Sequence, residues 1–181
     1  CAALSQEGFA AVPDAATRVT AARFVPASAR QVAHCEVQAY VAPNVGFELR
    51  LPARDWNGKF AQVGCGGFCG GVFPTACDAV LGRGYACVAT DMGHKSTALD
   101  AQWAYDNLQA EIDFAYRATH VVTLAGKAIT ERYFGRGPQR AYFLGCSTGG
   151  RQGMVEAQRF PWDYDGIVSG AGRRQSDMVT R

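Results

Sequence analysis

Long hydrophobic runs, a strong net charge and internal repeats are all missing from this sequence of 181 residues. No apolar stretch approaches the ~18 residues that a membrane span needs, so we expect no membrane partner. Lys and Arg number 18 against 16 Asp and Glu, and a net charge of +2 offers no basic surface for nucleic acid. No collagen period, heptad array or solenoid repeat occurs. The length and the hydrophobic content of 48% together predict one globular domain.

The sequence also lacks an initial Met, a signal peptide and any Asn-x-Ser/Thr sequon, whereas cysteine is abundant. Seven cysteines indicate an oxidising compartment, so we expect a processed protein that is secreted or periplasmic. Because seven is odd, one thiol is free or pairs outside this chain. Disulfides are the favoured interpretation of a cluster whose spacings do not form two zinc knuckles of the usual kind. A metal-binding module is the alternative for that cluster, which consists of Cys65, Cys69, Cys77 and Cys87.

Polarity patterns predict strands and helices that follow each other along the chain. Residues 36–42 and 47–51 alternate in polarity around Pro43 and Asn44, and they predict a β-hairpin. Short apolar strands are expected at residues 60–63, 85–90, 141–144 and 166–169, and helices at residues 75–83, 108–134 and 151–159. Residues 1–34 show no clear pattern. Strands that alternate with helices predict an α/β fold with a mostly parallel sheet flanked by helices.

A Gly-x-Ser-x-Gly pattern is the strongest chemical signal in the sequence. It spans residues 145–149, between the strand expected at residues 141–144 and the helix expected at residues 151–159. In that context the pattern predicts a nucleophile elbow, a sharp turn that exposes the Ser147 hydroxyl near a helix N-terminus. The alternative is an ordinary strand-to-helix turn without a catalytic role.

A glycine-rich loop at residues 64–71 follows the strand expected at residues 60–63. Hydrolases with a nucleophile elbow bind the oxyanion with the backbone N–H after the nucleophile and with an N–H from such an earlier loop. We therefore expect Thr148, together with Gly66 or Gly67, to form an oxyanion hole. The alternatives are that the glycines serve close packing or hold a phosphate. However, the loop lacks the Gly-Lys-Ser/Thr ending of a P-loop and the spacing of a dinucleotide fingerprint.

A histidine after the serine is missing. The elbow fold places the triad in the order Ser, then Asp or Glu, then His, but His34, His94 and His120 all precede Ser147. Either the triad is incomplete, or its remainder lies on polypeptide outside this sequence. His94, at the end of an expected strand, is an alternative base, and a structural hydrogen bond is its other interpretation.

These segments resemble the tannase and feruloyl esterase family. The resemblance covers almost the whole chain and is carried by residues 56–60, 64–71, 84–85, 90–94, 145–152, 157–161 and 164–168. It implies an α/β-hydrolase fold in which Ser147 is the nucleophile and the N–H groups of Thr148 and Gly67 form the oxyanion hole. It also implies a disulfide between Cys1 and Cys35, and a bond from Cys146 to a cysteine beside the triad histidine, outside this chain.

Members of that family carry a large inserted lid with a calcium site, and the triad acid and base follow the lid. The sequence contains none of these parts, so residues 1–181 are expected to be the N-terminal part of a catalytic domain, without the lid and the C-terminal strands. The implied activity is serine-dependent hydrolysis of feruloyl, galloyl or related hydroxybenzoate esters through an acyl-enzyme. No metal is expected in this chain, and its expected partner is a C-terminal polypeptide of the same protein. The alternative is a non-catalytic hydrolase-like subunit that binds a partner chain.

Overall fold

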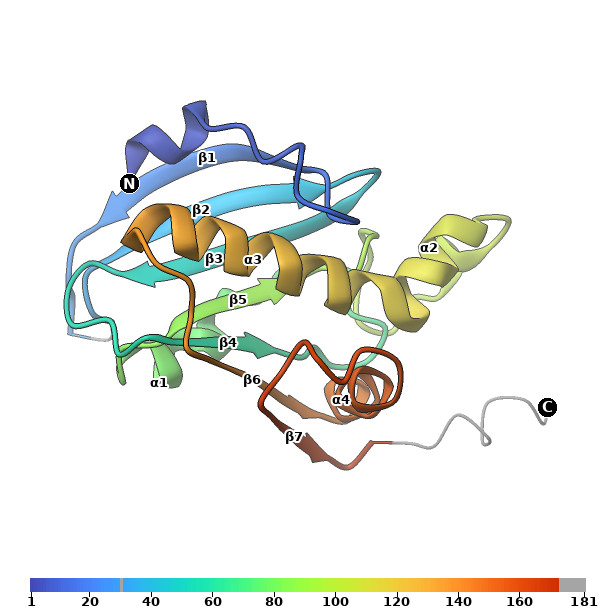
Figure 1. The fold of residues 1–181 in the computed structure, drawn as a ribbon. Coiled ribbons are helices and arrows are strands. Elements are labelled where there is room, and N and C mark those ends of the chain that lie inside the picture. The colour runs from blue at the N-terminus through green and yellow to red at the C-terminus, as the bar shows by residue number, and fades with distance from the viewer. Residues whose placement is uncertain (30, 173–181) are drawn as a thin grey trace.

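The computed structural model describes residues 1–29 and 31–172. A seven-stranded sheet in the order β1-β2-β3-β5-β4-β6-β7 forms the centre of this part of the chain (Figure 1). Its strands are β1 (Thr17–Val25), β2 (His34–Val41), β3 (Val45–Pro52), β4 (Lys59–Val63), β5 (Ala86–Thr90), β6 (Arg140–Cys146) and β7 (Gly166–Gly170).

Two long helices pack on the sheet, α3 (Ala118–Phe134) and α4 (Thr148–Arg159). The shorter helical segments among the described residues are η1 (Ala2–Gln6), η2 (Pro74–Cys77), α1 (Asp78–Leu81), η3 (Gln102–Ala104), α2 (Leu108–Ile112) and the π-helical turn η4 (Asp113–Arg117). None of the helices in the described ranges is long and apolar enough to cross a bilayer.

The sheet combines a parallel and an antiparallel part. Strands β5, β4, β6 and β7 run parallel to one another, whereas β1, β2 and β3 continue the sheet beyond β5 as antiparallel strands. The predicted α/β class is confirmed, and the predicted hairpin of residues 36–42 and 47–51 is formed by β2 and β3. The sheet is mixed because the N-terminal strands are joined by short connections, whereas a parallel pair needs a long crossover.

The chain reverses its direction of travel across the sheet at β4. It passes from β4 through α1 to β5, then returns through α3 to β6 on the other side of β4, and continues through α4 to β7. Because parallel crossovers are right-handed, this reversal puts α3 and α4 on one face and α1 on the other (Figure 1). Ligands of open α/β sheets bind outside the carboxyl ends of the strands at such a reversal point. Here β4 and β6 end side by side at that point.

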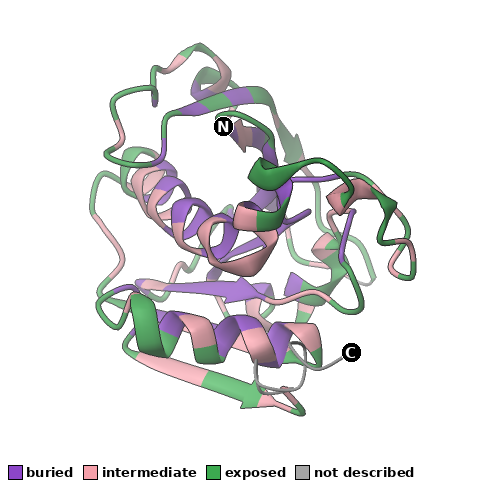
Figure 2. Ribbon diagram, turned by 90° about the vertical axis from the view of Figure 1, so that its right-hand side faces the viewer, coloured by how far each residue is buried: buried purple, intermediate pink, exposed green. Residues whose placement is uncertain are grey.

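The α3 helix lies close to the sheet because its inner face is made of small and branched side chains. Figure 2 shows this buried face, together with central strands that are mostly buried and a β7 edge whose residues are intermediate or exposed. A Cβ at Gly126 would lie 2.8 Å from the ring of Phe60 on β4. The absence of a side chain at Gly126 therefore allows α3 to lie this close to β4. The predicted helix over residues 108–134 is helical throughout, but η4 interrupts it with one wider turn between α2 and α3.

Strand β1 was not expected from the sequence. Its pairing with β2 shifts register between Val19 and Ala21, and this bulge breaks the alternation of inward and outward side chains. Only Thr17 and Val19 of β1 are buried. A strand with two buried positions and an interrupted period leaves no clear polarity pattern in the sequence.

Six of the seven cysteines form disulfides, which link Cys1 to Cys35, Cys65 to Cys69 and Cys77 to Cys87. The pairing of Cys1 with Cys35 that the resemblance implied is confirmed. The preference for disulfides over zinc in the cluster at residues 65–87 is also confirmed, and the metal-module alternative is wrong because its four thiols are oxidised. The seventh cysteine is Cys146, which is exposed and has no disulfide partner in this chain, and the odd cysteine count required one such residue.

Candidate active site

Ser147 occupies a strained turn between β6 and α4. Its backbone has φ 58° and ψ −119°, a region that residues with a side chain adopt rarely and at an energetic cost. The Ser147 N–H donates to the carbonyl of Gly170 at 2.9 Å, which ties the turn to the end of β7. The structure therefore gives Ser147 the exposed elbow geometry that the Gly-x-Ser-x-Gly pattern predicts.

The small residues around Ser147 are required by space. A Cβ at Gly145 would lie 2.2 Å from the carbonyl oxygen of Gly149, and a Cβ at Gly150 would lie 2.2 Å from the carbonyl oxygen of Gly170. A Cβ at Gly64, at the end of β4, would lie 2.5 Å from the Cα of Gly149. The first turn of α4 thus packs directly against both neighbouring loops, which explains why the motif is rich in glycine.

Gly67 lies beside the start of α4, as predicted. Its φ of +57° is left-handed, and a Cβ at this position would lie 2.2 Å from the carbonyl oxygen of Ala98, so only glycine fits. The Thr148 hydroxyl donates to the carbonyl of Gly67 at 2.6 Å. The N–H groups of Gly67 and Thr148 donate to no acceptor within the described residues. Gly66, the other predicted donor, has open space where a Cβ would lie, so sterics do not require a glycine there.

A small pocket joins these groups. Its volume is about 170 Å³, and it is lined by Gly67, Phe68, Phe114, Ser147, Thr148, Arg151 and Ala171. Ligand pockets for whole small molecules are commonly about 300–1,000 Å³. This pocket is therefore large enough for a reacting ester group and little more. The structure brings the predicted Ser147, Thr148 and Gly67 to one place, and their catalytic roles remain predictions.

Arg151 and Phe114 form a wall of this pocket that sequence patterns did not reveal. The guanidinium of Arg151 donates to the carbonyls of Phe114 and Ala115 at 2.8 and 2.9 Å, and it lies 4.5 Å from the centre of the Phe114 ring. Both carbonyls belong to η4, where the wider turn disrupts the regular helical hydrogen bonds. Burial lowers the pKa of Arg151. The signal for Arg151 in the sequence is its place directly after the glycines that follow the elbow. No sequence pattern indicates a role for Phe114.

Replacing Arg151 with lysine should destabilise the protein by about 1–3 kcal/mol, because an ammonium group does not reproduce the forked pair of bonds to two carbonyls. Urea unfolding measures this change. The control is Arg136→Lys, since Arg136 is exposed, lies over the ring of Trp56 and donates to no carbonyl of the described residues. Equal stability losses in the two variants would contradict this role for Arg151.

His94 lies behind the glycine loop and does not line the pocket. Its Nε2 is 2.7 Å from the carbonyl oxygen of Phe68, its ring stacks on Trp103, and burial lowers its pKa below 6.5. A neutral imidazole whose Nε2–H donates to a carbonyl cannot take a proton at that nitrogen. The sequence left two roles open for His94, a structural hydrogen bond and a catalytic base. This geometry favours the structural hydrogen bond.

Sequence comparison adds a decisive observation. The family model described as tannase and feruloyl esterase matches residues 29–175. The chain belongs to this family. The family assignment agrees with the elbow at Ser147 and with the resemblance found in the sequence.

Three relatives illustrate the assignment. The chain is 38% identical over 187 residues to mono(2-hydroxyethyl) terephthalate hydrolase from Piscinibacter sakaiensis, an alignment that covers 88% of this chain and 31% of that protein. It is 41% identical over 124 residues to feruloyl esterase B from Aspergillus niger, an alignment that covers 68% of this chain and 23% of that protein. The crystal structure of feruloyl esterase B from Aspergillus oryzae superposes with a TM-score of 0.80 at 33% identity. The superposition covers 86% of this chain and 34% of that chain. The chain thus spans about a third or less of the length of these family members.

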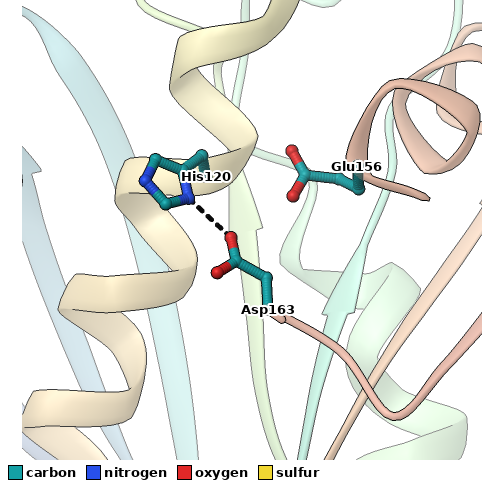
Figure 3. Close-up of side chains that lie close together, drawn as sticks. All are labelled: His120, Glu156 and Asp163. Carbon is teal, nitrogen blue, oxygen red and sulfur yellow. Dashed lines mark hydrogen bonds and ion pairs between the residues drawn. The ribbon is translucent and has the colours of Figure 1, made fainter. Parts of the chain in front are cut away.

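A second polar cluster lies away from the elbow, between α3, α4 and the loop before β7. His120 Nδ1 is 2.6 Å from Asp163 Oδ2, and the buried Glu156 carboxyl points toward the same place (Figure 3). Burial and the neighbouring Asp163 raise the pKa of Glu156 to about 9, so this carboxyl is neutral at pH 7.

The geometry of this cluster is that of a hydrogen-bonded group. The separation between His120 Nδ1 and Asp163 Oδ2 is that of a hydrogen bond. Two ligands of one zinc ion, each about 2 Å from the metal, lie farther apart than this. One imidazole and two carboxylates also fall short of the roughly six to eight oxygens that calcium takes. The cluster therefore does not provide the calcium site expected in a lid.

Proposed function

We propose that the protein containing this chain is a serine carboxylic-ester hydrolase acting on aromatic esters, and that Ser147 is its nucleophile. The observation that carries the proposal is the left-handed backbone of Ser147 at the start of α4, beside the N–H groups of Gly67 and Thr148, which have no acceptor among the described residues. The names of the relatives, feruloyl esterase and mono(2-hydroxyethyl) terephthalate hydrolase, point to esters of aromatic acids. Feruloyl, galloyl and related hydroxybenzoate esters are the proposed substrate class.

The proposed reaction proceeds in two steps. The Ser147 oxygen attacks the ester carbonyl and loses its proton to a base, while the N–H groups of Thr148 and Gly67 bind the developing oxyanion. The bond to the alcohol oxygen breaks, the alcohol leaves with that proton, and the acyl group stays on Ser147. Water then attacks the acyl-enzyme by the same route and releases the aromatic acid.

The proposed reaction needs a base beside Ser147. No histidine lies at the pocket within the described residues, and the relatives are about three times as long as this chain. We propose that a C-terminal polypeptide of the same protein supplies the triad Asp and His and a lid that binds calcium. The free and exposed Cys146 is the proposed point of covalent attachment, through a disulfide. Such disulfides need an oxidising environment, so we propose a secreted or periplasmic protein.

Labelling with a fluorophosphonate tests the assignment of Ser147. In the full-length gene product the activated serine should attack phosphorus and displace fluoride, and the mass of the peptide containing Ser147 should increase accordingly. Methyl ferulate and methyl gallate hydrolysis should disappear in step with the labelling. Hydrolysis that continues after full labelling, or an adduct on another serine, would refute the proposal. A protein that neither labels nor hydrolyses these esters would instead be a non-catalytic subunit that binds a partner chain.

A further inference from the structure

The two donors of the proposed oxyanion hole belong to different parts of the chain. Gly67 lies in the loop after β4, and Thr148 is the first residue of α4. The Cys65–Cys69 disulfide closes the loop on itself and does not join it to the helix. The separation of the two N–H groups is therefore set by non-covalent contacts between the loop and α4.

One such contact is made by the Thr148 side chain. Its hydroxyl donates to the carbonyl of Gly67 at 2.6 Å, so the residue that offers one backbone donor also holds the residue that offers the other. The Gly67 backbone needs this support, because its left-handed conformation is available to glycine together with several others. A hydroxyl bond to the carbonyl restricts the glycine to one of them.

A second contact is made by Gln152, which is only 3% exposed. Its side-chain oxygen accepts the N–H of Cys65 at 3.1 Å. Its amide nitrogen donates to the sulfur of Met92 and to the hydroxyl of Thr119, which is 3.4 Å away. These two contacts fix the orientation of the Gln152 side chain. The beginning of the loop is thereby fixed to α4, about one turn after Ser147.

The outer side of the loop is held independently of α4. The N–H of Phe68 donates to the carbonyl of Ala98 at 2.8 Å, and His94 contacts the carbonyl of Phe68. Removing a contact with α4 should therefore leave the loop folded but allow Gly67 to move relative to Thr148. Displacements of about 1 Å in a catalytic group can reduce a rate about 100-fold.

We propose that the Thr148 hydroxyl is a positioning group that, with Gln152 as a second anchor, fixes the Gly67 N–H at the distance from the Thr148 N–H that the oxyanion requires. This inference rests on the proposed esterase function. It assigns to the Thr148 side chain a task separate from that of its backbone. The N–H binds the oxyanion, and the hydroxyl places the other donor.

The test is Thr148→Val in the full-length protein, because valine has the same shape and keeps the backbone N–H but has no hydroxyl. We expect kcat for methyl ferulate to fall about tenfold while KM changes less than about twofold, since the oxyanion forms only in the transition state. Affinity for phenylboronic acid, which forms a tetrahedral adduct with an active serine, should fall in parallel with kcat. Thr148→Ser should restore both quantities.

The matched control is Thr20→Val on β1, where the hydroxyl also donates to a backbone carbonyl, that of Gln38 at 3.0 Å. Its kinetic constants should equal those of the wild type. Should Thr148→Val fail to fold, Gln152→Met tests the second anchor with the same expected split between kcat and KM. An unchanged kcat in Thr148→Val, in a protein that Ser147→Ala inactivates, would overturn the positioning role and leave the esterase function intact. Loss of activity that Thr148→Ser does not restore would also overturn it.

Discussion

Replacing Ser147 with alanine is expected to lower kcat/KM for methyl ferulate by about 10⁴-fold or more in the full-length protein, because only binding and oxyanion stabilisation remain when the nucleophile is absent. The substitution removes one exposed oxygen. Alanine keeps a Cβ at φ 58°, so the strain of the elbow is the same in both proteins. Steady-state hydrolysis measures the loss, and the midpoint of thermal unfolding should not change.

The control for Ser147→Ala is Ser5→Ala, since Ser5 lies in η1 and its hydroxyl donates to the nearby carbonyl of Ala2. Its kcat/KM should remain within about twofold of the wild-type value. Hydrolysis of methyl ferulate at an undiminished rate by Ser147→Ala would exclude Ser147 as the nucleophile and would leave the elbow as an ordinary strand-to-helix turn.

Sequence patterns predicted the parts of this site that depend on local chemistry. Ser147 was found because a strained turn leaves small residues at fixed spacings, and Thr148 because it follows the nucleophile, whereas the pattern left Gly66 and Gly67 open and the family resemblance chose Gly67. The hairpin of β2 and β3 was found from its alternating polarity, although nearly every residue of both strands is buried, and Glu48 and Arg50 are buried as an ion pair. The order of these strands and helices along the chain then placed the loop and the elbow at the same edge of the sheet.

Features that depend on contacts between distant segments were not predicted. The carbonyls that Arg151 holds are 36 and 37 residues away in the sequence, and they are accessible because a π-helical turn displaces them. Four clustered cysteines allow three pairings, and composition does not choose among them. The pairs Cys65–Cys69 and Cys77–Cys87 form because η2 and β5 bring the second pair together, away from the loop.

The buried carboxyl of Glu156 should make the stability of the protein depend on pH. Its pKa is about 9 in the folded chain and 4.5 ordinarily, so the fold favours the protonated form. The stabilisation is complete below pH 4.5 and is lost as pH rises toward 9, by at most about 1.4 kcal/mol per pH unit. Burial and the neighbouring Asp163 disfavour the ionised carboxyl of Glu156, and the charge of Lys127 offsets this only in part.

Glu156→Gln tests this prediction, because an amide has nearly the same shape and stays neutral at every pH. Between pH 5 and pH 8.5 the variant should lose less stability in urea unfolding than the wild type, and at pH 8.5 it should be the more stable protein. The groups that face Glu156 are Asp163, Lys127 and Tyr164, and they are unchanged in the comparison. Glu131→Gln on the exposed side of α3 is the control and should follow the wild-type curve. Parallel curves for Glu156→Gln and the wild type would show that Glu156 titrates normally and would contradict the prediction.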